Sequence, residues 1–142
     1  MLCRRLVLTV IMLQAIAVLG QDIQNNKCVL QIDTLTKLKV FTATEKMPEV
    51  QGGMEGLYKE VNKRLILPSS LKDVGEIKLV VAFIVKDDGS IIGKRVIKNV
   101  KGTDLAEQYL NTIGSMKWKP GTCNGKKVSV LMVLPMYIEL EL

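Results

Sequence analysis

The stretch 75–89 constrains the fold of this chain more than any other, because it has the pattern of a central β-strand. Its sequence is GEIKLVVAFIVKDDG, in which every second residue from Ile77 to Val85 is apolar. This alternation places five apolar side chains on one face of a strand. The other face is charged at both ends and apolar in the middle, at Val80, Ala82 and Ile84. A strand that is apolar on both faces at its centre predicts the middle position of a sheet.

Two further strands are expected after it. Asp88 and Gly89 favour a tight turn, because both residues tolerate positive φ. Residues 90–100 then form the hairpin partner, in which Gly93 predicts a bulge or a close backbone contact. In residues 126–142 every second residue from Val128 to Leu140 is apolar, which predicts one long final strand. Pro135 within that strand has no N–H to donate, so at least one edge of the strand is expected to be open near it.

Two amphipathic helices complete the pattern. The first follows a loop at 45–53 and ends before Pro68; its apolar stripe is Met54, Leu57, Tyr58, Val61 and Leu65. The second opens at Asp104, which forms a capping-box-like pair with Glu107, although Thr103 is an alternative cap. Gly114 is expected to end this helix. One short helical turn is expected at 69–74, and a second loop at 116–121.

The order helix, strand, strand, helix, strand predicts an α+β fold. A right-handed crossover from the second strand through the helix places the third strand parallel to the second. The first strand then lies between them and is antiparallel to both. The result is a three-stranded mixed sheet of order 2-1-3, with both helices packed on one face.

The beginning of the chain has the form of a secretory signal peptide. Residues 1–20 combine Arg4 and Arg5 with an apolar run at 6–19, and the expected cleavage is before Gln21, with the stretch 15–17 as the second choice. The alternative is an uncleaved inner-membrane anchor, for which the run is short. Residues 21–44 are then an N-terminal extension with one short edge strand, and residues 45–142 are the folded domain.

Composition argues against catalysis. The chain has no histidine, which removes the commonest general base and a common metal ligand. No nucleophile motif is present, and Asp87-Asp88 beside Gly89 fits a turn better than a Ca²⁺ site. We therefore expect no enzyme activity, no cofactor and no metal. The formal net charge is +6, but the lysines are scattered, which favours a solvated surface over nucleic-acid binding.

Two cysteines remain beyond the signal peptide, Cys28 and Cys123. An even count in an oxidising compartment predicts a disulfide between them. In the chain-entropy model such a bridge contributes about 4 kcal/mol, because it closes a loop of roughly 95 residues. The alternative is a pair of free thiols.

Three segments together resemble a known family. They are EKMPEVQGG at 45–53, VAFIVKDDG at 81–89 and WKPGTCNGKKV at 118–128. In order and spacing they are similar to the C-terminal domain of TonB, in the form found in Bacteroidetes, over residues 45–142. Val50-Gln51 and Leu67-Pro68 depart from the family's usual Phe-Pro and Tyr-Pro. The family's energy transducers also use an anchor histidine and a proline-rich linker, whereas this chain has no histidine and only 4 prolines. No contact with the ExbB–ExbD motor is therefore expected.

The resemblance implies a periplasmic binding module that supports transmembrane transport. TonB C-terminal domains capture an extended segment of a TonB-dependent outer-membrane receptor by β-augmentation. By analogy, the edge that binds receptor or other envelope-protein segments is formed by Val128, Ser129, Val130, Leu131, Met132, Val133 and Leu134. The alternative for this edge is that it is idle or covered. Alternatives for the protein are a membrane-anchored energy transducer and a structural envelope protein that forms a homodimer through the same strand.

Trp118 belongs to the most specific of the three segments. We expect its indole to fill the core between sheet and helices, with Lys117 and Lys119 pointing outward. The alternative is a surface position at which the indole anchors a peptide.

Overall fold

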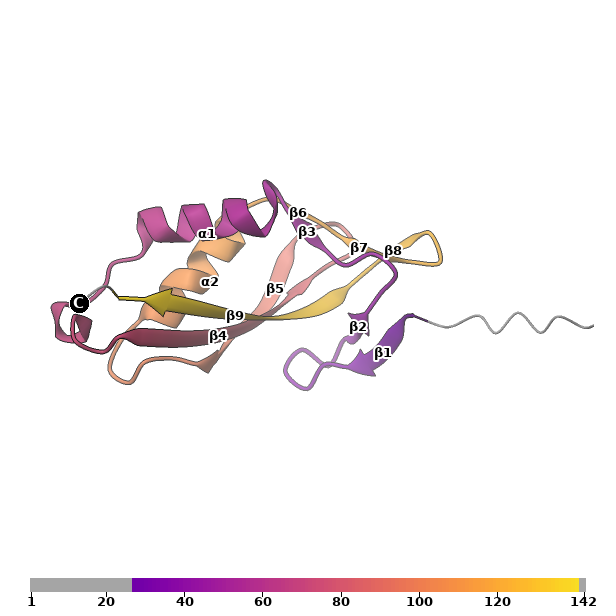
Figure 1. Cartoon of the computed structure of the whole chain (residues 1–142). Coiled ribbons are helices and arrows are strands. Elements are labelled where there is room, and N and C mark those ends of the chain that lie inside the picture. Colours follow the sequence, from indigo (N-terminus) through magenta and orange to yellow (C-terminus); the bar gives the residue numbers. More distant parts are fainter. Residues whose placement is uncertain (1–26, 141–142) are drawn as a thin grey trace, which may run out of the picture.

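The computed structural model describes residues 27–140, which form a sheet with two helices on one face (Figure 1). The predicted signal peptide lies outside the described residues. The sheet has five strands in the order β1 (Val29–Ile32), β2 (Lys39–Ala43), β9 (Val130–Glu139), β4 (Glu76–Val85) and β5 (Ile91–Lys98). The helices are α1 (Gly53–Arg64) and α2 (Leu105–Ser115), and a short 3₁₀ turn, η1 (Ser69–Leu71), precedes β4. The predicted α+β class is confirmed.

The predicted arrangement of the three long strands is also confirmed. β4 lies between β5 and β9 and is antiparallel to both. Its pairing with β9 is regular over the whole strand, from Glu76 opposite Glu139 to Val85 opposite Val130. This continuous ladder follows from the alternation in β4, because a shift of one residue would turn its apolar face away from the helices.

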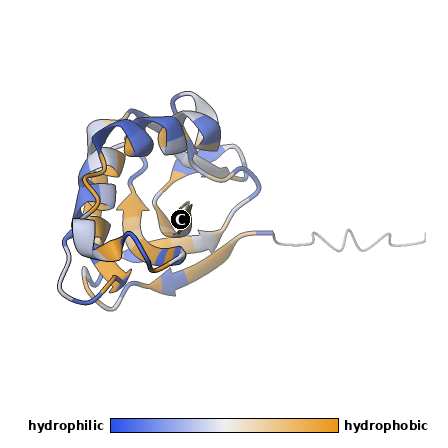
Figure 2. Ribbon diagram, turned by 60° about the vertical axis from the view of Figure 1, so that its left-hand side comes forward, coloured by the Kyte–Doolittle hydropathy of each residue, from blue (hydrophilic) through white to orange (hydrophobic). Residues whose placement is uncertain are grey.

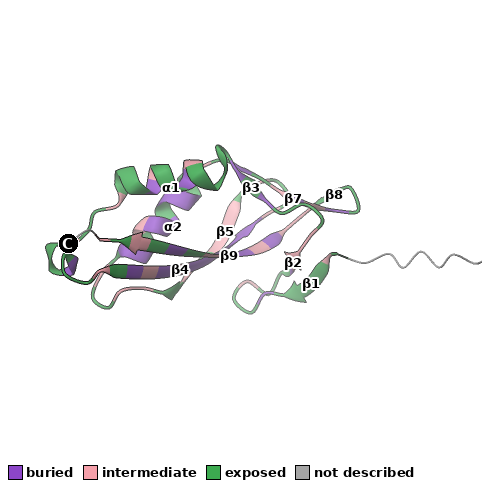
Figure 3. Ribbon diagram, viewed as in Figure 1, coloured by how far each residue is buried: buried purple, intermediate pink, exposed green. Residues whose placement is uncertain are grey.

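The main core lies between the helices and the facing side of the sheet. Its side chains come from alternate positions of β4 and β9 and from one stripe of each helix. Figure 2 marks the hydrophobic stretches of the ribbon, and Figure 3 marks the buried ones. Leu57 and Val61 of α1 and Tyr109 and Ile113 of α2 are completely buried. Apolar burial of this kind contributes about 25 cal/mol per Å² and is the main stabilising term of the fold.

Two glycines allow the β4–β5 hairpin to pack closely. Gly89 has a φ of +85°, and a Cβ at this position would lie 2.6 Å from the backbone oxygen of Trp118. Gly93 has a φ of +60° and lies where the register of the ladder shifts between Ala82 and Ile84. The predicted bulge at Gly93 is therefore confirmed.

The predicted N-terminal extension forms a hairpin of two strands, β1 and β2, where one short strand was expected. We call residues 27–43 the N-terminal wing, because this hairpin extends the sheet beyond the part that the helices cover (Figure 1). Val40 of β2 is completely buried, as are Ala82 and Ile84 of β4, which point away from the helices. These three side chains lie outside the main core cluster. The wing thus covers part of the outer face of the sheet.

The prediction for the start of α2 was wrong in its detail. Asp104 and Glu107 do not form the predicted capping box, because the side chain of Asp104 makes no capping hydrogen bond. Instead, Asn99 Oδ1 accepts from the amide of Ala106 at 3.2 Å, while Asn99 Nδ2 donates to Glu107 Oε2 at 3.1 Å. The hydroxyl of Thr103 donates to the oxygen of Val100 and does not cap the helix either. A residue outside the helix therefore supplies the cap.

The predicted long final strand is divided into two. β8 (Lys126–Val128) pairs with β7 (Gly121–Cys123), and β9 begins two residues later at Val130. Asn124 and Gly125 both have positive φ, as a two-residue hairpin turn requires. At the break, Ser129 Oγ accepts from the amide of Asp87 at 3.2 Å. No helix among residues 27–140 is long and apolar enough to cross a membrane.

Candidate functional site: the free edge of β9

β9 has one edge that other strands only partly cover. Its first edge is fully paired with β4. On its second edge β2 pairs in parallel at a single position, where Phe41 lies opposite Val130. The amide of Phe41 donates to the oxygen of Ser129 at 2.9 Å. After Ala43 the chain leaves the sheet, so most of this second edge has no partner strand among the described residues.

The direction of that hydrogen bond shows which backbone groups point to the free side. Backbone N–H and C=O groups alternate between the two edges of a strand from one residue to the next. The oxygen of Ser129 points toward β2, so residues of the same parity direct their backbone groups toward the free edge. Beyond β2 these residues are Val133, Pro135, Tyr137 and Glu139.

Pro135 is one of the residues whose backbone faces the free edge. It is opposite Val80 of β4, but by parity its nitrogen faces the free edge. The proline therefore costs no hydrogen bond of the β4–β9 ladder. Within residues 27–140 no strand pairs with this edge near Pro135, as expected from the sequence.

The seven residues predicted as the peptide-binding edge have different positions in the structure. Val128 belongs to β8 and lies opposite Gly121. Ser129 and Val130 contact β2, as described above. The remaining four residues lie in β9 beyond the pairing with β2; they are Leu131, Met132, Val133 and Leu134. The row of free backbone groups continues past them to Glu139.

Side chains beside the free edge are apolar on both faces of the sheet. On the helix side, Met132 and Met136 are buried and Leu134 is half-buried. On the outer side, Val133 is 55% exposed and Tyr137 is 56% exposed. An extended segment laid along this edge would find apolar contacts for its side chains in both directions.

A cation lies over the one aromatic ring of this edge. Lys78 is opposite Tyr137 in the β4–β9 ladder, and its Nζ is 5.1 Å from the centre of the Tyr137 ring. Such a contact stabilises the ring position by about 0.5–1 kcal/mol at an exposed site. The cation comes from β4, so this contact lies on the outer face of the sheet at the paired side of β9.

Two of the segments that resemble the TonB family pair with each other. Loops were predicted at 45–53 and 116–121, but these stretches contain the two-residue strands β3 (Glu49–Val50) and β6 (Trp118–Lys119), which are antiparallel. Trp118 is 7% exposed, and its Nε1 donates to the oxygen of Ile113 at 3.0 Å. Its ring meets Phe83 edge to face at 5.2 Å. The predicted core position of Trp118 is therefore confirmed.

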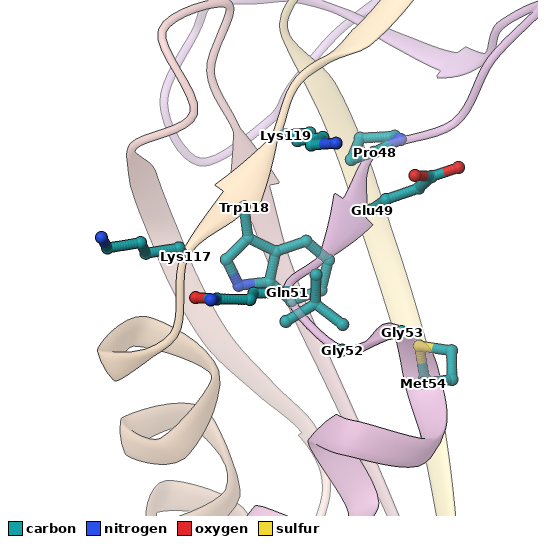
Figure 4. A pocket seen from close by; sticks show the side chains of 10 residues that line it. Pro48, Glu49, Gln51, Gly52, Gly53, Met54, Lys117, Trp118 and Lys119 are labelled. Atoms are coloured by element: carbon teal, nitrogen blue, oxygen red, sulfur yellow. The ribbon is translucent and has the colours of Figure 1, made fainter.

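These paired segments line a surface hollow of about 780 Å³. Figure 4 shows the indole of Trp118 beside Gln51, with Lys117 pointing away from it. The hollow extends to Gly52, Gly53 and Met54 at the start of α1. Its charged side chains, Glu49, Lys117 and Lys119, are exposed to solvent, so we assign it no chemistry.

The predicted disulfide is present. Cys28, at the start of the N-terminal wing, is bonded to Cys123 of β7, and their Cα atoms are 6.2 Å apart. Nearby, Lys46 forms an isolated bridge with Thr122. The wing and the segment that follows it are therefore fixed to the β7–β8 hairpin, which holds β2 in place on the β9 edge.

Comparisons with known proteins gave matches among solved structures. The TonB C-terminal domain of Helicobacter pylori (residues 179–285, solution NMR) is 20% identical, with a TM-score of 0.42, over 62% of this chain and 80% of that chain. The TonB C-terminal domain of Pseudomonas aeruginosa (solution NMR) is 19% identical, with a TM-score of 0.42, over 54% of this chain and 79% of that chain. Both are C-terminal domains of TonB, the family that the sequence motifs resemble. No protein-family model and no curated protein matches the sequence.

Proposed function

We propose that this protein is a TonB-like binding module that captures extended peptide segments at the free edge of β9. The observation that carries the proposal is the row of outward-facing backbone groups from Val133 to Glu139. A segment added there gains main-chain hydrogen bonds with little demand on its sequence. The role is binding, and we propose no catalytic step.

β2 is an example of such an addition within the chain itself. It lies parallel to β9 at Phe41 and Val130, so this edge already accepts one strand in parallel orientation. A captured segment would continue the line of β2 toward Glu139. Because β2 and the disulfide-bonded wing occupy the beginning of the edge, the site we propose is shifted from residues 128–134 to residues 131–139.

Side chains next to the edge define the chemistry of the partner. The partner's alternate residues would contact Leu134 and Ile138 on the helix side, and Val133 and Tyr137 on the outer side. Short extended segments with apolar residues at alternate positions fit this edge best. In keeping with the motif resemblance, we propose that the partners are segments of TonB-dependent receptors or other envelope proteins, met in the periplasm.

An NMR titration tests this function. The ¹⁵N-labelled chain beginning at Gln21 is titrated with peptides from the N-terminal segments of outer-membrane receptors of the source organism. We expect the amide signals of Val133 and Tyr137 to shift, while those of β5, on the far side of the sheet, do not. The same peptides with alternate backbone nitrogens methylated serve as controls, because they cannot complete the ladder. Absence of shifts along 131–139 with every peptide would refute capture at this edge.

Self-association through the same edge gives a different result. A homodimer would shift the same amides with rising protein concentration and without peptide. Sedimentation of the chain alone therefore separates a peptide-binding module from a structural protein that pairs with itself.

A further inference from the structure

The N-terminal wing exposes an unusual number of aliphatic side chains. Five of its residues are between 43% and 62% exposed, namely Val29, Leu30, Ile32, Leu35 and Leu38. All four residues of β1 are exposed. On a soluble protein such a group of exposed aliphatic side chains marks an interaction surface.

The turn between β1 and β2 is built to hold this surface in place. The amide of Asp33 donates to the oxygen of Leu38 at 2.8 Å, and the amide of Lys37 donates to the oxygen of Asp33 at 2.9 Å. The amide and hydroxyl of Thr36 both donate to Asp33 Oδ2, at 2.9 and 2.8 Å. Leu35 and Leu38 are thus presented to solvent by a turn whose backbone is fixed.

The exposed charged residues of the wing are all positively charged. Lys27, Lys37 and Lys39 are exposed, and none of them has a carboxylate within 4 Å among the described residues. Asp33, which is the acidic residue of the wing, is buried and forms an ion pair with Arg95 of β5. Aliphatic side chains with lysines beside them suit a lipid interface, where amphipathic helices use the same combination.

We propose that the N-terminal wing docks on an anionic lipid surface. Leu35 and Leu38 at its tip would enter the boundary between headgroups and acyl chains, and the lysines would contact lipid phosphates. The charge of the wing favours this partner over others, because its exposed charged residues are lysines and none of them has a carboxylate partner among the described residues.

This surface is separate from the proposed peptide site. The wing ends at Ala43, whereas the free row on β9 begins at Val133, beyond the pairing with β2. Docking of the wing would hold the module at a membrane with the β9 edge still free. The proposal can therefore fail while peptide capture stands, and the reverse is also true.

Vesicle binding tests the proposal. The chain beginning at Gln21 is used, because the core clusters and the disulfide lie within residues 27–140 and the apolar run would bind lipid by itself. We expect it to sediment with vesicles of phosphatidylglycerol and phosphatidylethanolamine, but not with phosphatidylcholine vesicles. The double variant Lys37→Gln/Lys39→Gln should partition on the order of tenfold more weakly, because each lysine near an anionic surface adds to binding. Leu35→Ser/Leu38→Ser should weaken it by at least a similar factor, because the apolar contact is lost.

Matched controls come from other parts of the molecule. Ile66, between α1 and η1, is the most exposed aliphatic residue described, at 75%, and Lys72 and Lys101 lie in turns far from the wing in the chain. Ile66→Ser and Lys72→Gln/Lys101→Gln should bind vesicles like the wild type. Thermal unfolding of all variants verifies that they are folded.

A fluorescent reporter locates the contact directly. Leu35→Trp places an exposed indole at the tip, whereas the native Trp118 is buried and gives a constant signal. We expect its emission to shift to shorter wavelength on addition of anionic vesicles, and inorganic phosphate at constant ionic strength to leave this shift unchanged. An unshifted emission, equal binding to both kinds of vesicle, or displacement by phosphate would each overturn the proposal. So would a homodimer that Leu35→Ser/Leu38→Ser dissociates, because the surface would then pack against a second copy.

Discussion

Arg95 of β5 and Asp33 of the N-terminal wing form an ion pair on the outer face of the sheet. Arg95 Nη2 lies 2.6 Å from Asp33 Oδ1, and Arg95 Nη1 lies 3.4 Å from Asp33 Oδ2. Asp33 is only 1% exposed, so this contact fixes the turn of the wing to a strand that is 62 residues away in the sequence.

Removal of the arginine should destabilise the protein more than removal of both charges. Arg95→Met leaves a buried carboxylate without its cation, which we expect to cost about 2–3 kcal/mol, less than for a fully buried pair because Arg95 is partly exposed. The double variant Asp33→Asn/Arg95→Met should recover part of this loss. Chemical unfolding at neutral pH measures both, and equal stability of Arg95→Met and wild type would show that the ion pair is not stabilising.

The same ion pair predicts how stability depends on pH. Burial by itself would raise the pKa of Asp33, but hydrogen bonds from Thr36 and Arg95 outweigh it and lower the pKa to about 2. In the unfolded chain this carboxyl titrates near pH 3.9, which is roughly the ordinary value for aspartate. The stabilisation is therefore complete above the unfolded pKa and is lost as pH falls toward 2. The difference in melting temperature between wild type and Asp33→Asn should shrink between neutral pH and pH 2.

Reduction of the disulfide should lower stability substantially. Cys28 and Cys123 are separated by 95 residues, and a bridge of that span contributes about 4 kcal/mol in the chain-entropy model. We expect the melting temperature of the wild type to fall in dithiothreitol. Cys28→Ser/Cys123→Ser should melt at that lower temperature with or without the reductant. A melting temperature of the wild type that dithiothreitol leaves unchanged would show that the bridge contributes nothing.

A helix or strand could be predicted where its apolar residues repeat with a regular spacing in the sequence. β4 was predictable because every second residue from Ile77 to Val85 is apolar and its other face is apolar at the centre, and both helices were predictable because their apolar stripes repeat over three turns. β3 and β6 were not, since two-residue strands have no period and form only because their segments meet in space. The Asn99 cap was missed for a related reason, because the capping side chain lies outside the helix.

The candidate site was predicted in part. The apolar residues of one parity indicated the last strand and Pro135 indicated its open edge, and both observations concern β9 alone. That β2 covers the beginning of this edge could not be predicted, because the contact is a single parallel bridge between Phe41 and Val130 and leaves no pattern in either segment. The exposure of the aliphatic residues on the wing could not be predicted either. Apolar residues in a strand normally imply a buried face, whereas all four residues of β1 are exposed.

Tyr109 of α2 should tolerate the loss of its hydroxyl group. The residue is completely buried, and its Oη is the buried side-chain polar atom without a hydrogen-bond partner in the part of the chain that the structure describes. Burial, and to a smaller extent Tyr58, raises the pKa of this phenol well above its ordinary value, so it stays protonated. Tyr109→Phe removes an unsatisfied polar group and should stabilise the fold by about 1 kcal/mol. Tyr137→Phe, at an exposed position, is the control and should leave the melting temperature unchanged.

Proline substitutions along β9 distinguish the free edge from the paired one. Val133 has the same parity as Pro135, so Val133→Pro removes an N–H that faces the free edge, and the fold should survive as it does at Pro135. Peptide capture should then be lost, because the row has no donor left between β2 and Tyr137. Leu134→Pro removes an N–H that faces β4 and should unfold the domain, at a cost of about 3 kcal/mol or more.

Pro135→Val completes the set by adding a donor to the same row. Because it supplies one further N–H to an incoming strand, it should strengthen peptide binding in the NMR titration without changing the β4–β9 ladder. The three variants differ in their effect only if the backbone of β9 alternates between a paired and a free edge as the hydrogen bond from Phe41 to Ser129 indicates. Unfolding by Val133→Pro together with tolerance of Leu134→Pro would reverse that assignment and remove the proposed site.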